Sequence, residues 1–359
     1  MALTRRDFGL MAAAAGFAAG PAFADAPAAA IVAEGGAAEE RIEDTRSALD
    51  LAINQGCDFV QVNLVPTKEG ALVARRENEL SAGADVASHP EFADRKTTKT
   101  IGGADVTGWF AEDFTLAELR TLTCREPLPE FRPQNVKLAG KEPILTLADV
   151  LQIARDGCVR TARTVGVCLR PMRTEDYANL GLDVLGRLAS DLATEGYAAP
   201  AAAVWVQSSD ADALKTFAQL SRLRRMLLID TGESDKVTTA GLADITTYAQ
   251  AIAPDQDLLL DPSAAIFPAP TTLALDAHNA GLQLFSRTTR SQNQFLPPAL
   301  RRGDKHSVLF PHERGDVDKL LIALFADRVD GLCTDLPADA AKARKAVADA
   351  IAQAHSKRG

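Results

Sequence analysis

Short apolar runs alternate with amphipathic stretches along this chain from Ala29 onward. The runs have the length of buried strands, and the stretches between them repeat their apolar residues with helical spacing. A strand followed by a helix about eight times over predicts an α/β fold, the (β/α)8 TIM barrel. Strands are expected at 30–33, 58–65, 71–74, 164–169, 203–207, 226–229, 258–260, 282–285 and 331–334, and helices at 43–54, 147–154, 182–193, 211–220, 240–252, 271–280, 317–325 and 338–354.

Length and composition favour one large domain. Barrels often exceed 250 residues as a single unit, and this chain has 359 residues. No apolar run reaches the roughly 18 residues of a membrane span, so we expect no integral membrane segment. The formal net charge is −9, which gives no general electrostatic attraction to nucleic acid or to an anionic membrane.

Residues 1–24 have the pattern of a twin-arginine leader. The stretch Thr4-Arg5-Arg6-Asp7-Phe8-Gly9-Leu10 precedes an Ala/Gly-rich run, which ends in the cleavage pattern Ala22-Phe23-Ala24. We therefore expect a mature protein of residues 25–359 that is periplasmic or otherwise exported. Removal of two arginines and one aspartate changes the net charge from −9 to −10.

The five cysteines include no C-x-x-C pair. Two of them, Cys168 and Cys333, fall in apolar runs, where cysteine usually behaves as a small hydrophobic residue. We expect no catalytic or metal-binding cysteine, while a disulfide between Cys124 and Cys158 stays open.

The segment 58–80 places polar side chains inside an apolar pattern. Gln61 and Asn63 are two residues apart in the run F-V-Q-V-N-L-V, so they leave the same face of one strand. After a turn at 66–70, a second apolar run ends at Arg75-Arg76. In a parallel barrel, chemistry is found where strands end in loops.

The segment 81–141 interrupts the alternation. It is polar and rich in Pro and Gly, and it has one helix-like piece at 115–122 with Thr115 as cap and Glu118 in the capping-box position. We interpret it as an insertion beside the mouth of the barrel.

Segment 58–80 resembles the glycerophosphodiester phosphodiesterase family, in its longer periplasmic form, whose pattern is close to D-F-I-E-x-D-L-V-x-T-K-D-G-x-L-V-A-R-H-E-N-E-I. The insertion carries the most specific part of the resemblance, and the matching segments are distributed over most of the length of the mature chain: 89–100, 107–116, 128–133, 295–297 and 329–335. The resemblance implies a TIM barrel. It also implies phosphodiester hydrolysis by two histidines, with a divalent cation, often calcium, that holds the phosphate.

The positions that carry this chemistry in the family hold other residues here. The two catalytic histidines correspond to Glu34 and Arg76, and the phosphate-binding arginine to Gly35. The three metal-binding carboxylates correspond to Gln61, Asn63 and Arg170. A lysine after the third ligand corresponds to Met172, and the seventh-strand pattern places Arg287 and Arg290 at the site.

These substitutions oppose both halves of the family mechanism. Calcium is held mainly by carboxylate oxygens, and amides and arginine do not replace them, so we expect no metal and no other cofactor. Arginine has no lone pair with which to accept a proton, so Arg76 cannot serve as a general base. We expect Glu34 to pair with Arg76, and Arg170 with Arg287 to leave the pocket cationic.

Three interpretations stay open. The chain is a pseudoenzyme that binds an anionic phosphodiester or lipid head group through arginines. Alternatively, it is a relic barrel whose role lies on its outer surface and whose protein partner is unknown. The third interpretation is an active enzyme with a rewired site, which would release an alcohol and glycerol 3-phosphate from a glycerophosphodiester.

Overall fold

The computed structural model describes residues 29–264 and 267–356, so the predicted leader lies outside the described residues. The chain divides into two compact units. The first consists of Ala33–Asn54 and Asp58–Arg225, and the second consists mainly of the residues from Met226 onward.

The first unit has a sheet of parallel strands with one antiparallel addition. β2 (Phe59–Pro66) pairs in parallel with β6 (Gly166–Pro171), and β6 pairs in parallel with β7 (Val204–Ser208). The short strand β3 (Leu72–Ala74) returns antiparallel to β2. Its helices outside the insertion are α2 (Arg46–Asn54), α4 (Leu147–Thr161), α5 (Thr174–Asn179), α6 (Val184–Thr194) and α7 (Ala211–Leu220).

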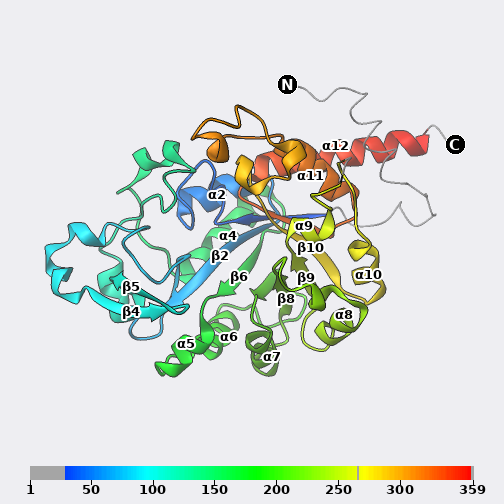
Figure 1. Cartoon of the computed structure of the whole chain (residues 1–359). Helices are drawn as coiled ribbons and strands as arrows, with labels where there is room; N and C mark the ends of the chain where they lie inside the picture. Colours follow the sequence, from blue (N-terminus) through cyan, green and yellow to red (C-terminus); the bar gives the residue numbers. More distant parts are fainter. Residues whose placement is uncertain (1–28, 265–266, 357–359) are drawn as a thin grey trace. The chain divides into compact units, whose positions relative to one another are not determined.

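The second unit continues the same pattern. β9 (Ala251–Pro254) lies between β8 (Arg224–Ile229) and β10 (Gln283–Thr289), and β11 (Gly331–Thr334) follows β10, all in parallel pairings (Figure 1). The α-helices are α8 (Thr239–Ile245), α9 (Gln256–Leu259), α10 (Leu273–Asn279), α11 (Val317–Ala326) and α12 (Pro337–Ser356), and the 3-10 helices are η5 (Ser234–Val237), η6 (Asn293–Phe295), η7 (Pro298–Leu300) and η8 (Phe310–His312).

The eight parallel strands, β1 (Ala30–Glu34), β2 and β6 to β11, follow the order of a closed barrel. Buried apolar side chains lie along all of these strands, as β2 and β9 illustrate. The predicted (β/α)8 barrel is therefore confirmed.

One predicted strand is wrong. Residues 258–260 were expected to be extended, but Leu258 and Leu259 lie in α9. The strand is formed by Ala251–Pro254, whose first two residues fell at the end of the predicted helix 240–252. Both 251–254 and 258–260 are short apolar runs, and periodicity alone does not show which of them forms the strand. Pro254 disfavours continuation of a helix. The run before it is the one that pairs with both β8 and β10.

The segment 81–141 contains a hairpin that the sequence reading did not predict. Its strands are β4 (Thr97–Ile101) and β5 (Ala104–Gly108). The predicted cap at Thr115 is confirmed, because Thr115 and Glu118 form both bonds of a capping box at α3 (Leu116–Leu119). The remaining turns are η1 (Val86–Ser88), η2 (Pro90–Arg95), η3 (Ala111–Asp113) and η4 (Pro133–Leu138).

Two further expectations bear on the described residues. Cys124 and Cys158 are free thiols, so the disulfide that the sequence left open does not form. Among the described helices, none combines the length and the apolar composition that a membrane crossing needs.

Candidate functional site

Gln61 and Asn63 lie side by side on β2, both almost fully buried. The amide Nε2 of Gln61 donates to Oδ1 of Asn63 over 3.3 Å, as expected for side chains that share a strand face. Across the sheet, Asn63 is in register with Arg170 of β6. The three positions at which the family resemblance places metal ligands are therefore neighbours in the structure.

This donor set does not fit a divalent cation. Calcium and magnesium prefer carboxylate oxygens, and the oxygen of Asn63 already accepts a hydrogen bond from Gln61. Within the described ranges, no three His, Cys, Asp or Glu side chains are grouped so that they could hold a metal ion. The buried Oε1 of Gln61 has no hydrogen-bond partner, so this acceptor still lacks a donor.

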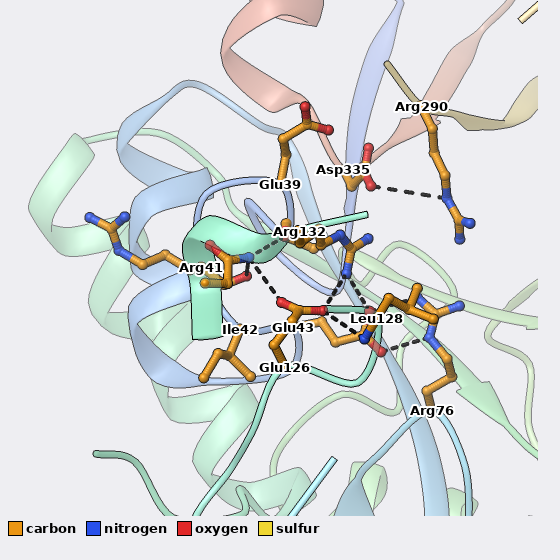
Figure 2. A network of polar contacts seen from close by, with 12 residues as sticks. Glu39, Arg41, Ile42, Glu43, Arg76, Glu126, Leu128, Arg132, Arg290 and Asp335 are labelled. Atoms are coloured by element: carbon orange, nitrogen blue, oxygen red, sulfur yellow. Dashed lines mark hydrogen bonds and ion pairs between the residues drawn. The ribbon is translucent and has the colours of Figure 1, made fainter. Parts of the chain in front are cut away.

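Arg76, which the family resemblance places at the second histidine position, forms a bidentate ion pair. Its Nε lies 2.6 Å and its Nη2 2.7 Å from the two carboxylate oxygens of Glu43. This fork geometry is the strongest form of arginine–carboxylate contact. Figure 2 shows Arg76 and Arg132 both pointing at Glu43.

Arg132 is the functional-region residue that the sequence reading missed. It is only 2% exposed, and its Nη1 lies 2.9 Å from Oε2 of Glu43 and 3.7 Å from Glu126. Asn135 donates to Glu126 over 2.9 Å and to the carbonyl oxygen of Ala38 over 3.1 Å. The segment 126–135 is thereby bound to the loop that follows β1. The only signal in the sequence was an arginine between Phe131 and Pro133 in a segment that matched the family.

The ionisation of Glu43 follows from these contacts. Burial by itself would raise the pKa of Glu43, but the guanidinium groups of Arg76 and Arg132 outweigh burial and lower the pKa to about 2. The pKa of Arg76 is raised, because the charges of Glu43 and Glu34 outweigh its desolvation. The sequence reading named Glu34 as the partner of Arg76. In the structure, Arg76 makes its bidentate contact with Glu43. The negative charge of Glu34 contributes to the raised pKa of Arg76.

Asp44 is a second residue that the sequence reading did not single out. It is buried, has a φ of 59°, and its Oδ1 has no hydrogen-bond partner. Burial and the charge of Glu43 raise the pKa of Asp44 to about 8, so this carboxyl group is protonated at neutral pH. Asp44 and Arg75 line a cavity of about 30 Å³, and Nε of Arg75 is likewise buried without a partner.

Gly35 contributes its backbone to this arrangement. Its N–H donates to the carbonyl oxygen of Gln61 over 3.0 Å, and its own carbonyl oxygen accepts from N–H of Asp44 over 3.1 Å. With a φ of 66°, Gly35 has a conformation that favours glycine, and an added Cβ would lie 2.8 Å from Cβ of Glu43. A side chain at this position would therefore displace Glu43.

Arg170 and Met172 line a larger cavity of about 230 Å³ at the carboxyl ends of β6 and β7. Arg173, Ser208 and Asp210 also line it. Arg173 is paired with Asp176 over 2.7 Å, so part of the positive charge at the cavity is neutralised. Two arginines and three acidic residues, Glu175, Asp176 and Asp210, thus line a space large enough for a small ligand.

Arg287 and Arg290 belong to the second unit, and both have carboxylate neighbours there. Arg287 lies 2.9 Å from Asp230 and 3.6 Å from Asp255. Arg290 lies 4.0 Å from the buried Asp335, and its guanidinium group stacks over the ring of Phe295 at 4.8 Å. Two aspartates therefore offset the charge of Arg287 within its own unit. That Arg170 and Arg287 leave a pocket cationic stays a prediction.

Comparison with known sequences gives one consistent result. The family model described as "Glycerophosphoryl diester phosphodiesterase family" matches residues 35–339. The chain is 31% identical over 290 residues to glycerophosphodiester phosphodiesterase GDPD6 of Arabidopsis thaliana, which covers 74% of this chain and 75% of that protein.

Comparison with solved structures supports the fold. A candidate glycerophosphoryl diester phosphodiesterase from Silicibacter pomeroyi DSS-3 is similar with a TM-score of 0.64 at 14% identity, covering 90% of this chain and 95% of that one. A phosphodiesterase from Oleispira antarctica, solved in complex with the product sn-glycerol-3-phosphate, has a TM-score of 0.57 at 15% identity, covering 88% and 96%.

Proposed function

Because the chain belongs to the glycerophosphoryl diester phosphodiesterase family, we propose that it is a member that binds a glycerol phosphate or phosphodiester head group and does not hydrolyse it. The observation that carries the proposal is the hydrogen bond between Gln61 and Asn63 beside Arg170. Two amides and one guanidinium group stand where the family resemblance implies three carboxylate ligands. These three residues therefore do not support hydrolysis that depends on a bound divalent cation.

The acid–base half of the mechanism is equally altered. Arg76 is permanently charged and is held by Glu43, so it neither accepts a proton nor moves freely. Glu43, with a pKa of about 2, is too weak a base to assist a nucleophile at neutral pH. Loss of general acid–base assistance alone typically costs a factor of about 10² to 10⁴ in rate.

The ligand is assigned to the cavity beside Arg170. Guanidinium groups recognise phosphate oxygens well, and Ser208 offers a hydroxyl group in the same lining. A ligand of the same class as the sn-glycerol-3-phosphate bound to the Oleispira antarctica protein suits this lining. Arg76 has no part in this proposal, because its guanidinium group is already committed to Glu43.

The test combines an activity assay with a binding assay on the chain from Asp25 onward. We expect release of glycerol 3-phosphate from glycerophosphocholine to equal the buffer rate, with and without calcium. We also expect glycerol 3-phosphate to raise the melting temperature, since a ligand that binds only the native state stabilises it by RT ln(1 + [L]/Kd).

Arg170→Ala should abolish the thermal protection by glycerol 3-phosphate. The matched control is Arg187→Ala, which removes an exposed arginine that pairs with Asp191 on α6 and should leave the protection intact. Protection that survives Arg170→Ala would contradict the assignment of the ligand to this cavity. If glycerol 3-phosphate does not raise the melting temperature of the unchanged protein, the proposal that the barrel binds this ligand is wrong.

Asp44 favours a second candidate function, hydrolysis by rewired acid–base chemistry. The buried carboxyl group of Asp44, with a pKa of about 8, is a candidate general acid for such a reaction. If this candidate is correct, glycerophosphodiester turnover is measurable and is lost in Asp44→Asn. Turnover that needs Glu34 instead would be lost in Glu34→Gln.

We also propose that residues 1–24 direct export by the twin-arginine route. The paired arginines and the A-x-A pattern support this proposal. Mass spectrometry of the protein from the exported fraction should give an N terminus at Asp25. An intact Met1 in that fraction, or export that persists in Arg5→Lys/Arg6→Lys, would contradict it.

A further inference from the structure

The guanidinium group of Arg173 is only partly engaged. Its Nη2 lies 2.7 Å from Oδ2 of Asp176, three residues later on α5, whereas its Nε is buried and has no hydrogen-bond partner among the described residues. Nε and Nη2 lie on the edge of the guanidinium group that can bind two oxygens of one carboxylate or phosphate at once. An N–H group that is buried without an acceptor is unfavourable, so the ion pair with Asp176 leaves Arg173 incompletely satisfied.

Arg76 provides a comparison within the same unit. Its Nε and Nη2 both donate to the buried carboxylate of Glu43, over 2.6 Å and 2.7 Å (Figure 2). The side chain of Asp176, by contrast, is 57% exposed. An exposed ion pair contributes little to stability, because water and salt screen it. Asp176 can therefore separate from Arg173 at a small cost, whereas Glu43 cannot separate from Arg76 in this way.

The backbone of Arg173 has a conformation that residues with a side chain rarely adopt. Its φ is 50° and its ψ is 41°, in the left-handed region, at the residue before α5. Such conformations concentrate at ligand-binding and catalytic positions, where the surrounding structure maintains them. Arg173 also lines the cavity of about 230 Å³, together with Arg170. The strained residue with the incomplete contact is therefore at the cavity to which the ligand is assigned.

We propose that Arg173 is a second binding residue for a phosphoryl group in this cavity, and that Asp176 is an internal competitor that the ligand displaces. Two phosphoryl oxygens would bind Nε and Nη2 together, which gives Nε the acceptor that Asp176 does not supply. The exposed carboxylate of Asp176 would then turn to solvent. The inference rests on the proposed function, because it names a further residue of the same cavity and a contact that regulates its affinity.

The other acidic residues of the cavity differ from Asp176 in what they contact. Oδ1 of Asp210 accepts a hydrogen bond from N–H of Asp212 over 2.8 Å at the start of α7. Glu175 is exposed, and in the described chain the ion pair of Arg173 is made with Asp176 and not with Glu175. Both residues repel an anion through a screened charge, whereas Asp176 also occupies the Nη2 group that the ligand needs. Glu175 and Asp176 are therefore a matched pair for an experiment.

The experiment is isothermal titration calorimetry of the chain from Asp25 onward with glycerol 3-phosphate as the probe. Arg173→Ala should weaken binding by about tenfold or more, as expected for the loss of a charged hydrogen bond. Arg173→Lys should not restore the affinity, because lysine keeps the charge but cannot bind two oxygens side by side. Asp176→Asn should strengthen binding by about two- to fivefold, since it removes the competitor. Glu175→Gln, the control, should strengthen binding by less than about 1.5-fold, because it removes only a screened charge.

A double variant separates competition from general repulsion. In the Arg173→Ala background, Asp176→Asn should give no gain in affinity, because the group for which Asp176 competes is absent. Equal gains in both backgrounds, equal gains from Asp176→Asn and Glu175→Gln, or full affinity in Arg173→Lys would overturn the inference. If any of these results is found while Arg170→Ala still abolishes binding, the proposed function stands and only the role of Arg173 is wrong. A lack of binding by both the unchanged protein and Asp176→Asn would overturn the two proposals together.

Discussion

The guanidinium group of Arg132 lies 2.9 Å from the carboxylate of Glu43, although the two residues are 89 positions apart in the chain. Arg132 lies in the segment 81–141, and Glu43 lies in the loop after β1. Together with Arg76 they form a buried ionic cluster where the family resemblance implies a histidine and a phosphate-binding arginine. The first prediction concerns the stability of this cluster.

Arg132→Ala should lower the free energy of unfolding by about 3–5 kcal/mol, because it removes the buried positive charge that pairs with the carboxylates of Glu43 and Glu126. Urea denaturation followed by circular dichroism measures the change. The control is Arg120→Ala, which removes an exposed arginine paired with Asp149 at 3.2 Å and should cost less than about 1 kcal/mol. Equal costs for the two variants would mean that the cluster does not contribute to stability.

Asp44 predicts a distinctive dependence of stability on pH. Its pKa rises from the usual 3.8 to about 8 on folding, so the folded state holds a proton that the unfolded chain releases between these values. The contribution of Asp44 is therefore fully present below about pH 4 and declines as pH rises, by at most about 1.4 kcal/mol per pH unit, until it is lost above about pH 8.

Asp44→Asn removes the titrating group while it keeps the shape of the side chain. The advantage of the variant over the unchanged protein should therefore grow from pH 5 to pH 9 in urea denaturation. Asp94→Asn, at an exposed position of η2, is the control and should show no such trend. A difference between Asp44→Asn and the unchanged protein that is the same at pH 5 and pH 9 would show that Asp44 titrates normally.

The metal prediction follows from Gln61, Asn63 and Arg170. Calcium or magnesium at millimolar concentration should leave the melting temperature unchanged, because these side chains do not provide the carboxylates that such cations require. The triple variant Gln61→Glu/Asn63→Asp/Arg170→Glu should gain a calcium-dependent rise in melting temperature. A rise of several degrees in the unchanged protein would contradict the prediction.

Gly36 and Gly70 form a matched pair for testing how tightly the loop after β1 is packed. Both have a positive φ, 83° and 80°, so alanine is strained at either position. At Gly36 an added Cβ would lie 2.5 Å from the backbone of Ala48, whereas at Gly70 it would meet nothing within 4 Å. Gly36→Ala should therefore cost about 1–3 kcal/mol more than Gly70→Ala in thermal or urea denaturation. Equal costs would mean that the loop can shift away from α2.

The sequence predicted the barrel and the family because both rest on patterns that are local in the chain. The alternation of apolar runs and amphipathic stretches marked seven of the eight parallel strands, and only β9 was misplaced. The family resemblance followed from short segments such as 58–80, and the match over residues 35–339 confirms it. The prediction that Gln61, Asn63 and Arg170 stand in place of carboxylates likewise rests only on the order of residues in the sequence.

The tertiary structure alone decided which charges meet. The sequence predicted Glu34 as the partner of Arg76, whereas the contact of Arg76 with Glu43 and the contribution of Arg132 from the segment 81–141 are found only in the folded chain. The protonation of Asp44 was likewise hidden, since a pKa depends on burial and on neighbouring charges in space. Local patterns determine which elements form. Ion pairing and proton affinity depend on through-space distances between residues that are far apart in the chain, and these distances exist only in the folded protein.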